Sequence, residues 1–483
     1  MAILVIDAGT SSVRAAIVGP DATVRHEVHT ATLPDSPMPG LIEFDAQAYA
    51  DVALRNARQV LATYNGELGP IRGVGISNQR ASTVLWDRAT GTPVAPALGW
   101  QDLRTVGDCL ALNAEGFRQA PNLSATKLAH LLDLHDPQRT RDLCFGTLDS
   151  WLVWQLTEGA RHVADQTNAA VWGLLTPDAE NVDESLLARL RIPGSALPSV
   201  VDSTGVVGEA TALPGAPPIC GLAGDQQASL IGQACVEPGR GKITFGTGGM
   251  LDVCVGERPA FATRGPGGTF PVVCWRQDGR PTWGVEAVML SAGTNVEWLR
   301  DDLGVIPDAA ASAEIGASVP DTDGVTYVPA LLGLGTPVWD YGARGALLGL
   351  TRGTTAAHVV RAVLEGVAQR GADLVEAAEM DGGLRIDALR VDGGMSANPL
   401  FVQALADAAQ IPVEVSPVLE ATTLGAGFLA GLATGMWDTW DDLASTWAPK
   451  VRVEPAGSTD RDRWHEAVDR SRKWFPDLSA LDF

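Results

Sequence analysis

The run LVIDAGTSS at Leu4–Ser12 is echoed in the second half of this 483-residue chain by ITFGTGG at Ile243–Gly249. Each run is an apolar, β-rich stretch that ends in Gly-Thr and a group of small residues. A third run, LRVDGGMSAN at Leu389–Asn398, repeats the order of a strand followed by glycines. Glycines after a strand let backbone N–H groups approach a phosphate closely, and Thr or Ser hydroxyls add donors. One such turn is typical of any hairpin, but the repetition predicts a duplicated nucleotide-binding fold with its ligand between the halves.

The composition of the chain disfavours several classes of partner. Hydrophobic residues make up 46% and charged residues 19%, as in an ordinary globular protein, and the length predicts two or three domains. The formal net charge of −23 disfavours nucleic acid and offers no basic patch for an anionic membrane surface. Every apolar stretch is interrupted well before 18 residues, so no membrane span is predicted.

The six cysteines indicate a reducing compartment. None of them forms a CxxC pair and several lie in apolar runs, so we expect reduced core thiols in preference to disulfides or zinc ligands. The apolar start at Ala2–Ile6 is broken by Asp7, and no signal peptide is expected. These features predict a cytoplasmic protein.

Hydrophobic periodicity predicts alternating strands and helices. A β-hairpin pattern over residues 2–30 is followed by a helix at Ala46–Tyr64 and a buried strand at Arg72–Ser77, which is the order of an α/β layer. The further helices expected are Asp149–Leu156, Ala356–Met380, Pro399–Ala409 and Thr423–Gly435.

The hairpin pattern begins again in the second half of the chain. Asp202–Pro218 reads as a turn-rich connector into a strand at 217–224, and a helix follows. Beyond that helix the order of strands restarts, so we place a boundary near 238–243. The predicted domains are therefore 1–240 and 241–483.

Several ordered motifs carry a resemblance to a known family. The chain resembles the FGGY carbohydrate kinases and, within them, the glycerol kinases. The strongest match is GALLGLTRGTTAAHVVRAVLE at Gly345–Glu365, which fits the C-terminal signature of the family. The other matching motifs are ISNQRASTVLWDRATGTPV (Ile76–Val94), GWQDLRT (Gly99–Thr105), SATK (Ser124–Lys127), AGDQQA (Ala223–Ala228) and YVPALLGLGTPVWDYGARG (Tyr327–Gly345).

The resemblance implies a fold and a reaction. The fold is α/β, with two duplicated actin-like, or ribonuclease-H-like, ATPase domains that flank a catalytic cleft. The expected activity is ATP-dependent phosphorylation of a terminal hydroxyl, with Mg²⁺ as the metal and a small polyol or sugar at the deep end of the cleft. Family members suggest a homodimer or homotetramer.

The resemblance also places the nucleotide. Asp7, at the end of the first strand, is expected to hold Mg²⁺ through water, since Mg²⁺ prefers carboxylate oxygens and retained waters. Glu297 stands where glycerol kinases usually carry Gln, which leaves nucleotide preference open. The residues that match nucleotide-binding positions are Gly9, Thr10, Ser11, Arg14, Thr247, Gly248, Gly293, Glu297, Gly394 and Asn398.

Asp225 in the AGDQ motif is the candidate general base and a second candidate for the metal site. It follows a strand and opens a helix, so a purely structural role as a helix cap is the alternative. In the family the corresponding aspartate accepts the proton of the attacking hydroxyl. Gln226 is then expected to hydrogen-bond the acceptor.

The acceptor pocket departs from the glycerol-kinase pattern. Arg80 and Trp100 match the glycerol-binding Arg and Trp, but Ala81 replaces Glu, Asn122 replaces Tyr and Met250 replaces Phe. A buried hydroxyl that loses its partner costs about 1–3 kcal/mol, so these changes favour a pocket reshaped for a four- or five-carbon polyol or a ketose. The alternative is that glycerol is still bound through Arg80, Asp225, Gln226 and water.

A function of a different class is the alternative to a kinase. The same fold can serve as a non-catalytic sensor of a polyol or nucleotide. Loss of Asp7, Thr10 or Asp225 would favour the sensor, and all three are present.

Overall fold

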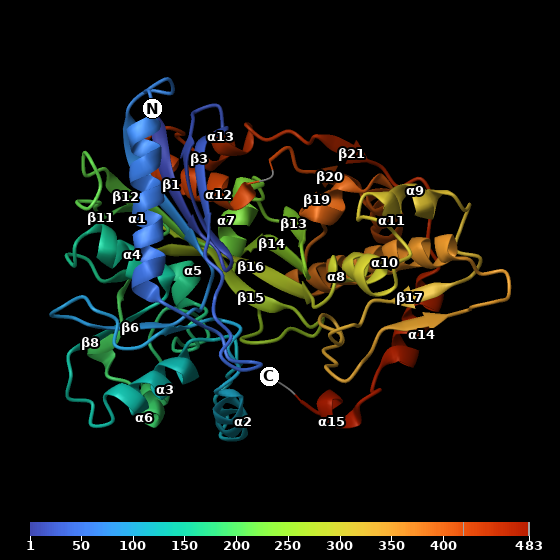
Figure 1. The fold of residues 1–483 in the computed structure, drawn as a ribbon, viewed down its shortest axis with the longest axis horizontal. Helices are drawn as coiled ribbons and strands as arrows, with labels where there is room; N and C mark the ends of the chain where they lie inside the picture. Colours follow the sequence, from blue (N-terminus) through green and yellow to red (C-terminus); the bar gives the residue numbers. More distant parts are fainter. Residues whose placement is uncertain (419, 482–483) are drawn as a thin grey trace.

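The computed structural model describes residues 1–418 and 420–481 and divides them between two α/β halves, each built on one large sheet (Figure 1). The first half of the chain forms the left side of Figure 1, and most of the second half forms the right side. The predicted two-domain α/β fold is confirmed. The finer division at residue 240 stays a prediction.

The first sheet has six strands in the order β11-β12-β5-β1-β2-β3. Its strands are β1 (Ala2–Ala8), β2 (Ser12–Val18), β3 (Val24–Ala31), β5 (Ile71–Asn78), β11 (Thr204–Glu209) and β12 (Pro218–Gly224). β1, β2 and β3 form an antiparallel meander, whereas β5 and β12 run parallel to β1 and β11 runs antiparallel to β12. The carboxyl ends of β1, β5 and β12 therefore lie at one edge.

The second sheet repeats this plan with one added edge strand. It has the order β15-β16-β14-β13-β19-β20-β21. Its strands are β13 (Gly241–Phe245), β14 (Gly249–Gly256), β15 (Phe270–Gln277), β16 (Arg280–Met289), β19 (Leu389–Asp392), β20 (Val413–Val415) and β21 (Val451–Val453). Here β13, β14 and β16 form the meander, β19 and β20 run parallel to β13, and β21 is antiparallel to β20. The duplication predicted from the two Gly-Thr turns is thus visible in strand order and direction.

This correspondence locates the third glycine run and corrects one expectation from the sequence. The third run is a strand followed by glycines, as expected, and its strand β19 takes the place of β5 in the duplicated plan. The segment 202–218 is more than a connector, because β11 lies inside it and forms the edge of the first sheet. Two glycines in this strand, including Gly205 with φ +138°, concealed the strand pattern.

Helices and short β pairs complete each half. The helices are α1 (Ala46–Thr63), α2 (Val106–Ala114), α3 (Ala125–His135), α4 (Leu148–Leu156), α5 (Gln166–Ala169), α6 (Glu184–Leu190), α7 (Asp225–Gly232), α8 (Thr294–Glu297), α9 (Ala311–Ala317), α10 (Ala356–Gly382), α11 (Pro399–Ala409), α12 (Ala421–Thr434), α13 (Trp440–Ala444), α14 (Arg461–Ser471) and α15 (Pro476–Ser479). The two-stranded pairs are β4 (Glu43–Phe44) with β7 (Ala97–Leu98), β6 (Val84–Asp87) with β8 (Leu143–Gly146), β9 (Val163–Asp165) with β10 (Ser199–Val201), and β17 (Thr326–Val328) with β18 (Ala346–Leu348). In residues 1–418 and 420–481, every helix is too short or too polar to cross a membrane.

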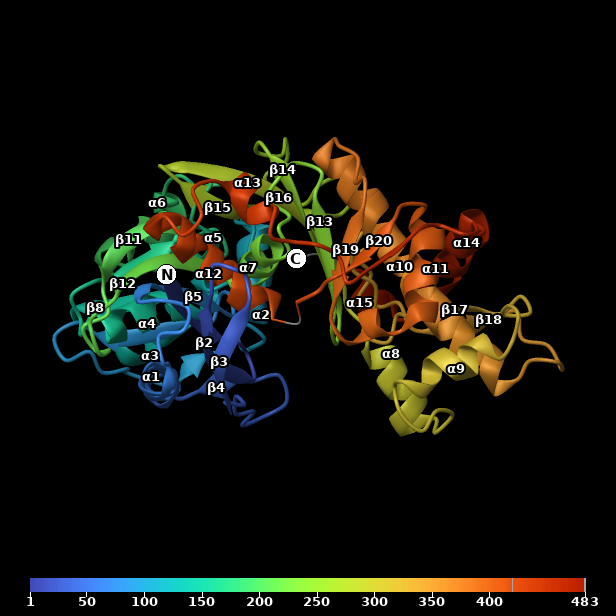
Figure 2. The same cartoon turned by 90° about the horizontal axis from the view of Figure 1, so that it is seen from above.

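Helix α12 comes from the second half of the sequence but packs on the first sheet. It contacts β1, β5 and β12, and both views place it beside α7 on the side of the N-terminal half (Figure 2). α7 follows β12 and α12 follows β20, so the two helices occupy equivalent places in the duplicated plan. They touch backbone to backbone, because a Cβ built at Gly425 would overlap the carbonyl oxygen of Ala228, and one built at Gly232 would overlap that of Ala421.

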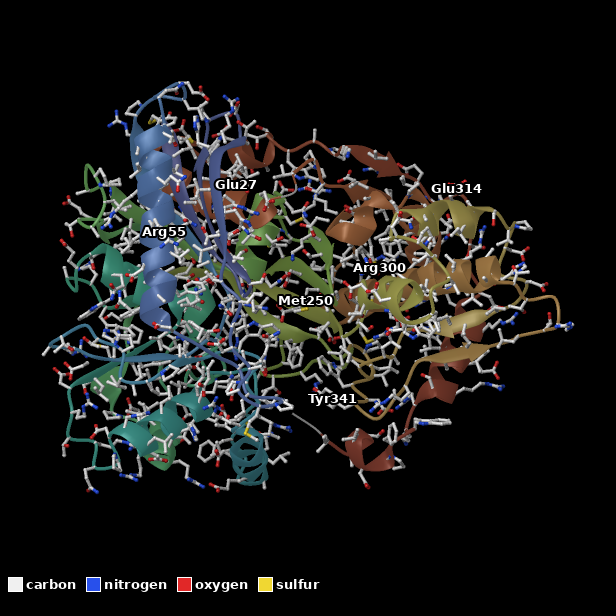
Figure 3. The ribbon with its side chains drawn as sticks, in the orientation of Figure 1. Glu27, Arg55, Met250, Arg300, Glu314 and Tyr341 are labelled. Carbon is white, nitrogen blue, oxygen red and sulfur yellow. The ribbon has the colours of Figure 1, made fainter. Side chains whose placement is uncertain are left out.

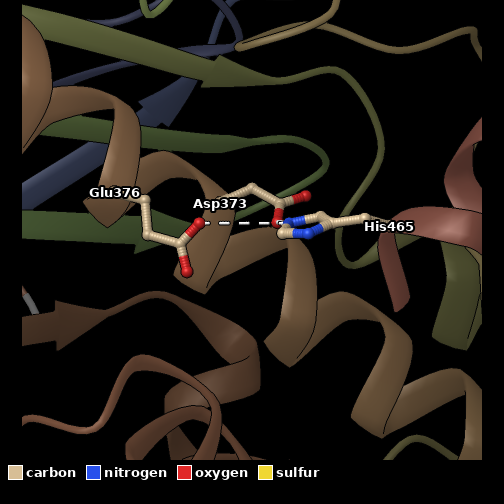
Figure 4. A group of neighbouring side chains, drawn as sticks. All are labelled: Asp373, Glu376 and His465. Atoms are coloured by element: carbon tan, nitrogen blue, oxygen red, sulfur yellow. Dashed lines mark ion pairs between the residues drawn. The ribbon is translucent and has the colours of Figure 1, made fainter. Parts of the chain in front are cut away.

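A buried carboxylate fastens α14 to α10. Asp373 accepts hydrogen bonds from Arg370 at 2.6 Å and Arg461 at 2.5 Å, and the indole of Trp464 donates to it at 3.0 Å. Burial opposes ionisation, but the hydrogen bond from His465 and the two arginines hold the pKa of Asp373 below its ordinary value. Figure 4 shows Asp373 with Glu376 and His465. These three could hold a metal by distance alone, but the arginines already bind both carboxylates, so the group is a structural clamp.

Replacing Asp373 with Asn is expected to lower the free energy of unfolding by about 3–5 kcal/mol, because Arg370 is left buried without its counter-charge. Urea denaturation would measure the loss. The matched control is Glu376→Gln, whose exposed side chain should contribute no more than about 1 kcal/mol. Equal effects of the two substitutions would contradict the clamp.

Candidate functional site

The carboxyl ends of three neighbouring parallel strands bring the first group of predicted residues together. β1 carries Asp7 near its end, β5 leads into Arg80, and β12 leads into Asp225. Asp7 and Ala223 both pair with Ser77 of the central strand β5. Open α/β sheets bind ligands outside the carboxyl ends of their strands, so this edge is the candidate site.

Asp7 is a buried carboxylate held by groups from both halves of the chain. It accepts hydrogen bonds from the hydroxyls of Ser77 at 2.7 Å and Thr423 at 3.1 Å, and the guanidinium of Arg14 lies 3.8 Å away. Burial raises the pKa of Asp7, although the two hydroxyls and Arg14 oppose this. Thr423 lies on α12, and sequence reasoning missed it because nothing in the sequence shows that α12 reaches this edge.

Arg14 lies beside Asp7 but is engaged by other carboxylates. Its Nε lies 3.2 Å from Glu27, and its Nη1 contacts Glu420. The guanidinium of Arg14 is therefore bound by acidic groups in this structure. To contact a phosphate, it has to release one of these carboxylates.

The first glycine turn is fixed by side chains around it. The Gly9 carbonyl accepts hydrogen bonds from the Tyr49 hydroxyl at 2.6 Å and from Gln79 at 3.3 Å. The indole N–H of Trp100 donates to the Thr10 hydroxyl at 3.1 Å. A predicted acceptor-pocket residue is thus tied directly to the predicted phosphate turn, which continues through Ser11 into β2.

Asp225 begins α7 and faces Arg80. Its Oδ1 lies 3.7 Å from Nε of Arg80, and Nη2 of Arg80 donates to Glu286 at 2.7 Å. Burial raises the pKa of Asp225, the charge of Arg80 opposes the rise, and the charge of Asp7 adds to it. The N-cap of α7 is Gly224, and the Asp225 carboxylate accepts a hydrogen bond from the adjacent Gln226 N–H at 2.8 Å. Because that geometry is not a cap, the structural alternative for Asp225 loses its support.

Lys242, Asp252 and Glu286 form a buried network of charges that contacts Arg80 and Gln226. Lys242 is fully buried, and its Nζ lies 2.8 Å from Asp252, 2.9 Å from Oε1 of Gln226 and 3.1 Å from the Thr244 hydroxyl. Burial would lower the pKa of Lys242, but Asp252 and Asp392 raise it above its ordinary value. The Lys242 ammonium thus fixes the orientation of the Gln226 amide by donating to its carbonyl oxygen.

Strand register explains why sequence reasoning missed this network. Lys242 pairs with Asp252 across β13 and β14, and Asp252 pairs with Glu286 across β14 and β16. Three charged residues therefore stand side by side on one face of the second sheet. A charge in the middle of each apolar strand was the available signal, but the pairing could not be read without the register.

The second glycine turn lies at the corresponding edge of the second sheet. The carbonyls of Gly246 and Thr247 accept hydrogen bonds from the amides of Gly293 and Ala292 at 2.9 and 2.8 Å. A Cβ at Gly293 would lie 2.6 Å from the Gly246 carbonyl oxygen, so only glycine fits there. The predicted group of Thr247, Gly248 and Gly293 is thus brought together around this turn.

The remaining nucleotide candidates, Gly394, Asn398 and Glu297, lie in different local environments. Gly394 follows β19, and a Cβ built on it would meet no heavy atom within 4 Å. Asn398 caps α11, accepting from the amides of Leu400 and Phe401, and its amide nitrogen donates to Ser312 at 3.0 Å. Glu297 is exposed at the end of α8, directly before the π-helical turn η2 (Trp298–Asp302). Asn398 therefore has a structural task that explains its presence without a ligand.

The four remaining acceptor candidates differ in how far they are buried. Ala81 is buried in a left-handed conformation with φ +60°. Trp100 is 38% exposed, and Asn122 lies exposed in the loop before α3. Met250, half-buried near the start of β14, lies between the two halves in Figure 3. Trp100 and Asn122 are thus more exposed than Ala81 and Met250.

Comparison with known proteins finds the same architecture throughout. Residues 2–232 and 241–434 match the N-terminal and C-terminal domain models of the FGGY family of carbohydrate kinases. The chain is 43% identical to a glycerol kinase of Aromatoleum aromaticum and 42% identical to one of Trichlorobacter lovleyi, in each case covering 98% of this chain and 99% of the relative. A crystal structure of Plasmodium falciparum glycerol kinase with ADP superposes with a TM-score of 0.91 at 28% identity, covering 97% of this chain and 98% of that chain.

Proposed function

Because the chain belongs to the FGGY family of carbohydrate kinases, we propose that it transfers the γ-phosphate of ATP to a terminal hydroxyl of glycerol. The observation that carries the proposal is the meeting of Asp7, Arg80 and Asp225 at one sheet edge, with a glycine turn on the equivalent edge of the other sheet. The product would be sn-glycerol 3-phosphate, and ADP would leave.

Asp225 supplies the proton transfer in this proposal. Its carboxylate accepts the proton of the acceptor hydroxyl while that oxygen forms a bond to the γ-phosphorus and the bond to the β,γ-bridging oxygen breaks. The side chain is suited to the task because it is 31% exposed and Arg80, 3.7 Å away, favours its ionised form. Arg80 itself is oriented by Glu286, so it can bind the acceptor without rearrangement.

The residues present also suit Mg²⁺ and the phosphates. Asp7 and Asp225 stand at the ends of β1 and β12, which flank β5 at one edge of the sheet, and the charge of Asp7 raises the pKa of Asp225. A divalent cation would relieve the repulsion between the two carboxylates. Bound Mg²⁺ would neutralise negative charge on the phosphates. The turns at Gly9–Ser11 and Thr247–Gly248 would donate to the phosphates from the two halves, with Gly293 and Gly394 at the nucleoside.

Glycerol is favoured as the acceptor over a larger polyol. The full-length relatives at 42–43% identity are glycerol kinases. Ala81 is only 4% exposed, so the short side chain at this position has not left it open to solvent. Glu286 also places a carboxylate 2.7 Å from Arg80, which offsets the acceptor lost at position 81. The four- or five-carbon polyol or ketose is retained as the second candidate on the exposed Asn122 and the half-buried Met250.

A substrate screen tests the proposal. ADP formation with glycerol is expected to exceed that with C4–C5 polyols and ketoses by about tenfold or more in kcat/KM, since one extra methylene in a fitted pocket costs about that much. A longer polyol or a ketose as the best substrate would select the second candidate. No ADP above the acceptor-free rate with any compound would contradict the kinase and favour a non-catalytic sensor.

The proposal extends to the compartment and to the oligomeric state of the protein. All six cysteines are buried free thiols, which suits a cytoplasmic enzyme. We propose a homodimer or homotetramer, as in related kinases, and light scattering on the purified protein would decide between them.

A further inference from the structure

A buried lysine joins two loops that carry acceptor candidates. Lys127 lies in the first turn of α3 with its side chain fully buried. Its Nζ donates to the carbonyls of Pro121 at 2.6 Å, Leu123 at 3.1 Å and Trp100 at 3.3 Å. Pro121 and Leu123 flank Asn122. One ammonium group thus holds the backbone on either side of Asn122 and that of Trp100.

A neighbouring residue extends the attachment to a third loop. Ser124, the buried residue directly before α3, donates from its hydroxyl to the Ala81 carbonyl at 2.9 Å. The residue after Ala81 is bonded as well, because the Trp100 amide donates to the hydroxyl of Ser82 at 3.2 Å. The start of α3 is therefore bonded to all three N-terminal loops that carry Ala81, Trp100 and Asn122.

The lysine is costly to bury, which argues that its charge has a use. Burying an ammonium group that bonds only to neutral carbonyls costs free energy that an apolar side chain of the same length would avoid. Burial lowers the pKa of Lys127 to about 8. The charged and titratable groups that face it are Asp102 and Arg104 in the loop before α2 and the Cys109 thiol on α2. Asp102 is itself engaged by Arg104 at 2.8 Å.

We propose that Lys127 is a positioning residue that sets the spacing between the Trp100 loop and the 121–123 loop, and so the width of the acceptor pocket. This inference rests on the proposed function, since it takes those loops as the pocket wall. The direct bonds of Lys127 go to the two acceptor loops, and its link to the first glycine turn is indirect, through the indole of Trp100 on Thr10. Its main influence is therefore expected on the acceptor, with a smaller one on ATP.

Three variants test the proposal. Lys127→Met keeps the length of the side chain and removes the donors, and Lys127→Arg keeps a charge and several N–H donors. Leu128→Ala is the matched control, because Leu128 is fully buried on the same helix and its apolar side chain packs in the core. Lys127→Met is expected to raise the KM for the acceptor about tenfold with the KM for ATP within about twofold, as for loss of roughly one charged hydrogen bond. Lys127→Arg should recover part of this, and Leu128→Ala should lower the melting temperature without changing the ratio of the two KM values.

Two further readouts separate this proposal from the proposed function. Hydrogen–deuterium exchange needs no substrate, and Lys127→Met should speed exchange in 99–103 and 120–124 more than Leu128→Ala does.

In the wild type the acceptor KM should rise between pH 7 and 9 as Lys127 loses its proton, and this rise should be absent in Lys127→Arg. Unchanged exchange in both loops, or equal rises in both KM values, would overturn the positioning role. A wild type that phosphorylates no acceptor would overturn the proposed function alone, because the exchange experiment still decides whether Lys127 ties the loops.

Discussion

Replacing Asp225 with Asn is expected to lower kcat by about 10²–10⁴-fold and to leave the KM for the acceptor close to the wild-type value. The amide has the same size and can still hydrogen-bond a hydroxyl, but it cannot accept its proton. Arg80 keeps its bond to Glu286, so the pocket retains its main fixed cation. Steady-state kinetics with saturating ATP would measure both constants.

The control for this substitution is Asp202→Asn. Asp202 is also partly exposed and also pairs with an arginine, Arg276 at 3.0 Å, but it lies outside the group formed by Asp7, Arg80 and Asp225. Its variant should keep the wild-type kcat. A near-normal kcat for Asp225→Asn would remove Asp225 as the base, and a large rise in acceptor KM with kcat unchanged would assign it to binding only.

Replacing Gly425 with Ala is expected to cost more than about 3 kcal/mol of folding free energy, which is large for a change of one methyl group. The new Cβ would overlap the carbonyl oxygen of Ala228, and both atoms belong to helix backbones that cannot move aside independently. α12 would be pushed away from α7 and from the first sheet. Soluble yield and urea denaturation would report the loss.

Gly107→Ala is the matched control for the helix crossing. Gly107 lies in α2, and a Cβ built there meets nothing within 4 Å. Alanine is the better helix former, so this variant should be neutral or more stable by up to about 1 kcal/mol. If both glycine variants are equally stable, close contact between α7 and α12 is not required.

The sequence was sufficient for the architecture because local patterns are repeated. The two Gly-Thr turns follow β1 and β13, which start the two duplicated sheets, and the two-domain fold they predicted is present. Strand order brings Asp7 and Asp225 to one edge without any knowledge of side-chain packing. Their proposed roles stay predictions.

What the sequence could not predict depends on contacts between distant elements. Lys242, Asp252 and Glu286 form a network only because of the register of three strands. Thr423 reaches Asp7 only because α12 returns to the first sheet. Asn398 matched a nucleotide position, but its side chain caps α11, and no motif distinguishes a cap from a ligand contact.

The return of α12 also sets the order in which the chain can fold during synthesis. Ile3 and Val5 of β1 share a core cluster with Leu424 and Phe428 of α12. Those two residues emerge from the ribosome only after most of the second half has been made. This face of the first sheet therefore lacks α12 through most of translation. A nascent chain ending near residue 240 has α7 on that face but leaves the apolar surface under α12 exposed to solvent and to chaperones. The N-terminal half completes its core only when nearly the whole chain has been synthesised.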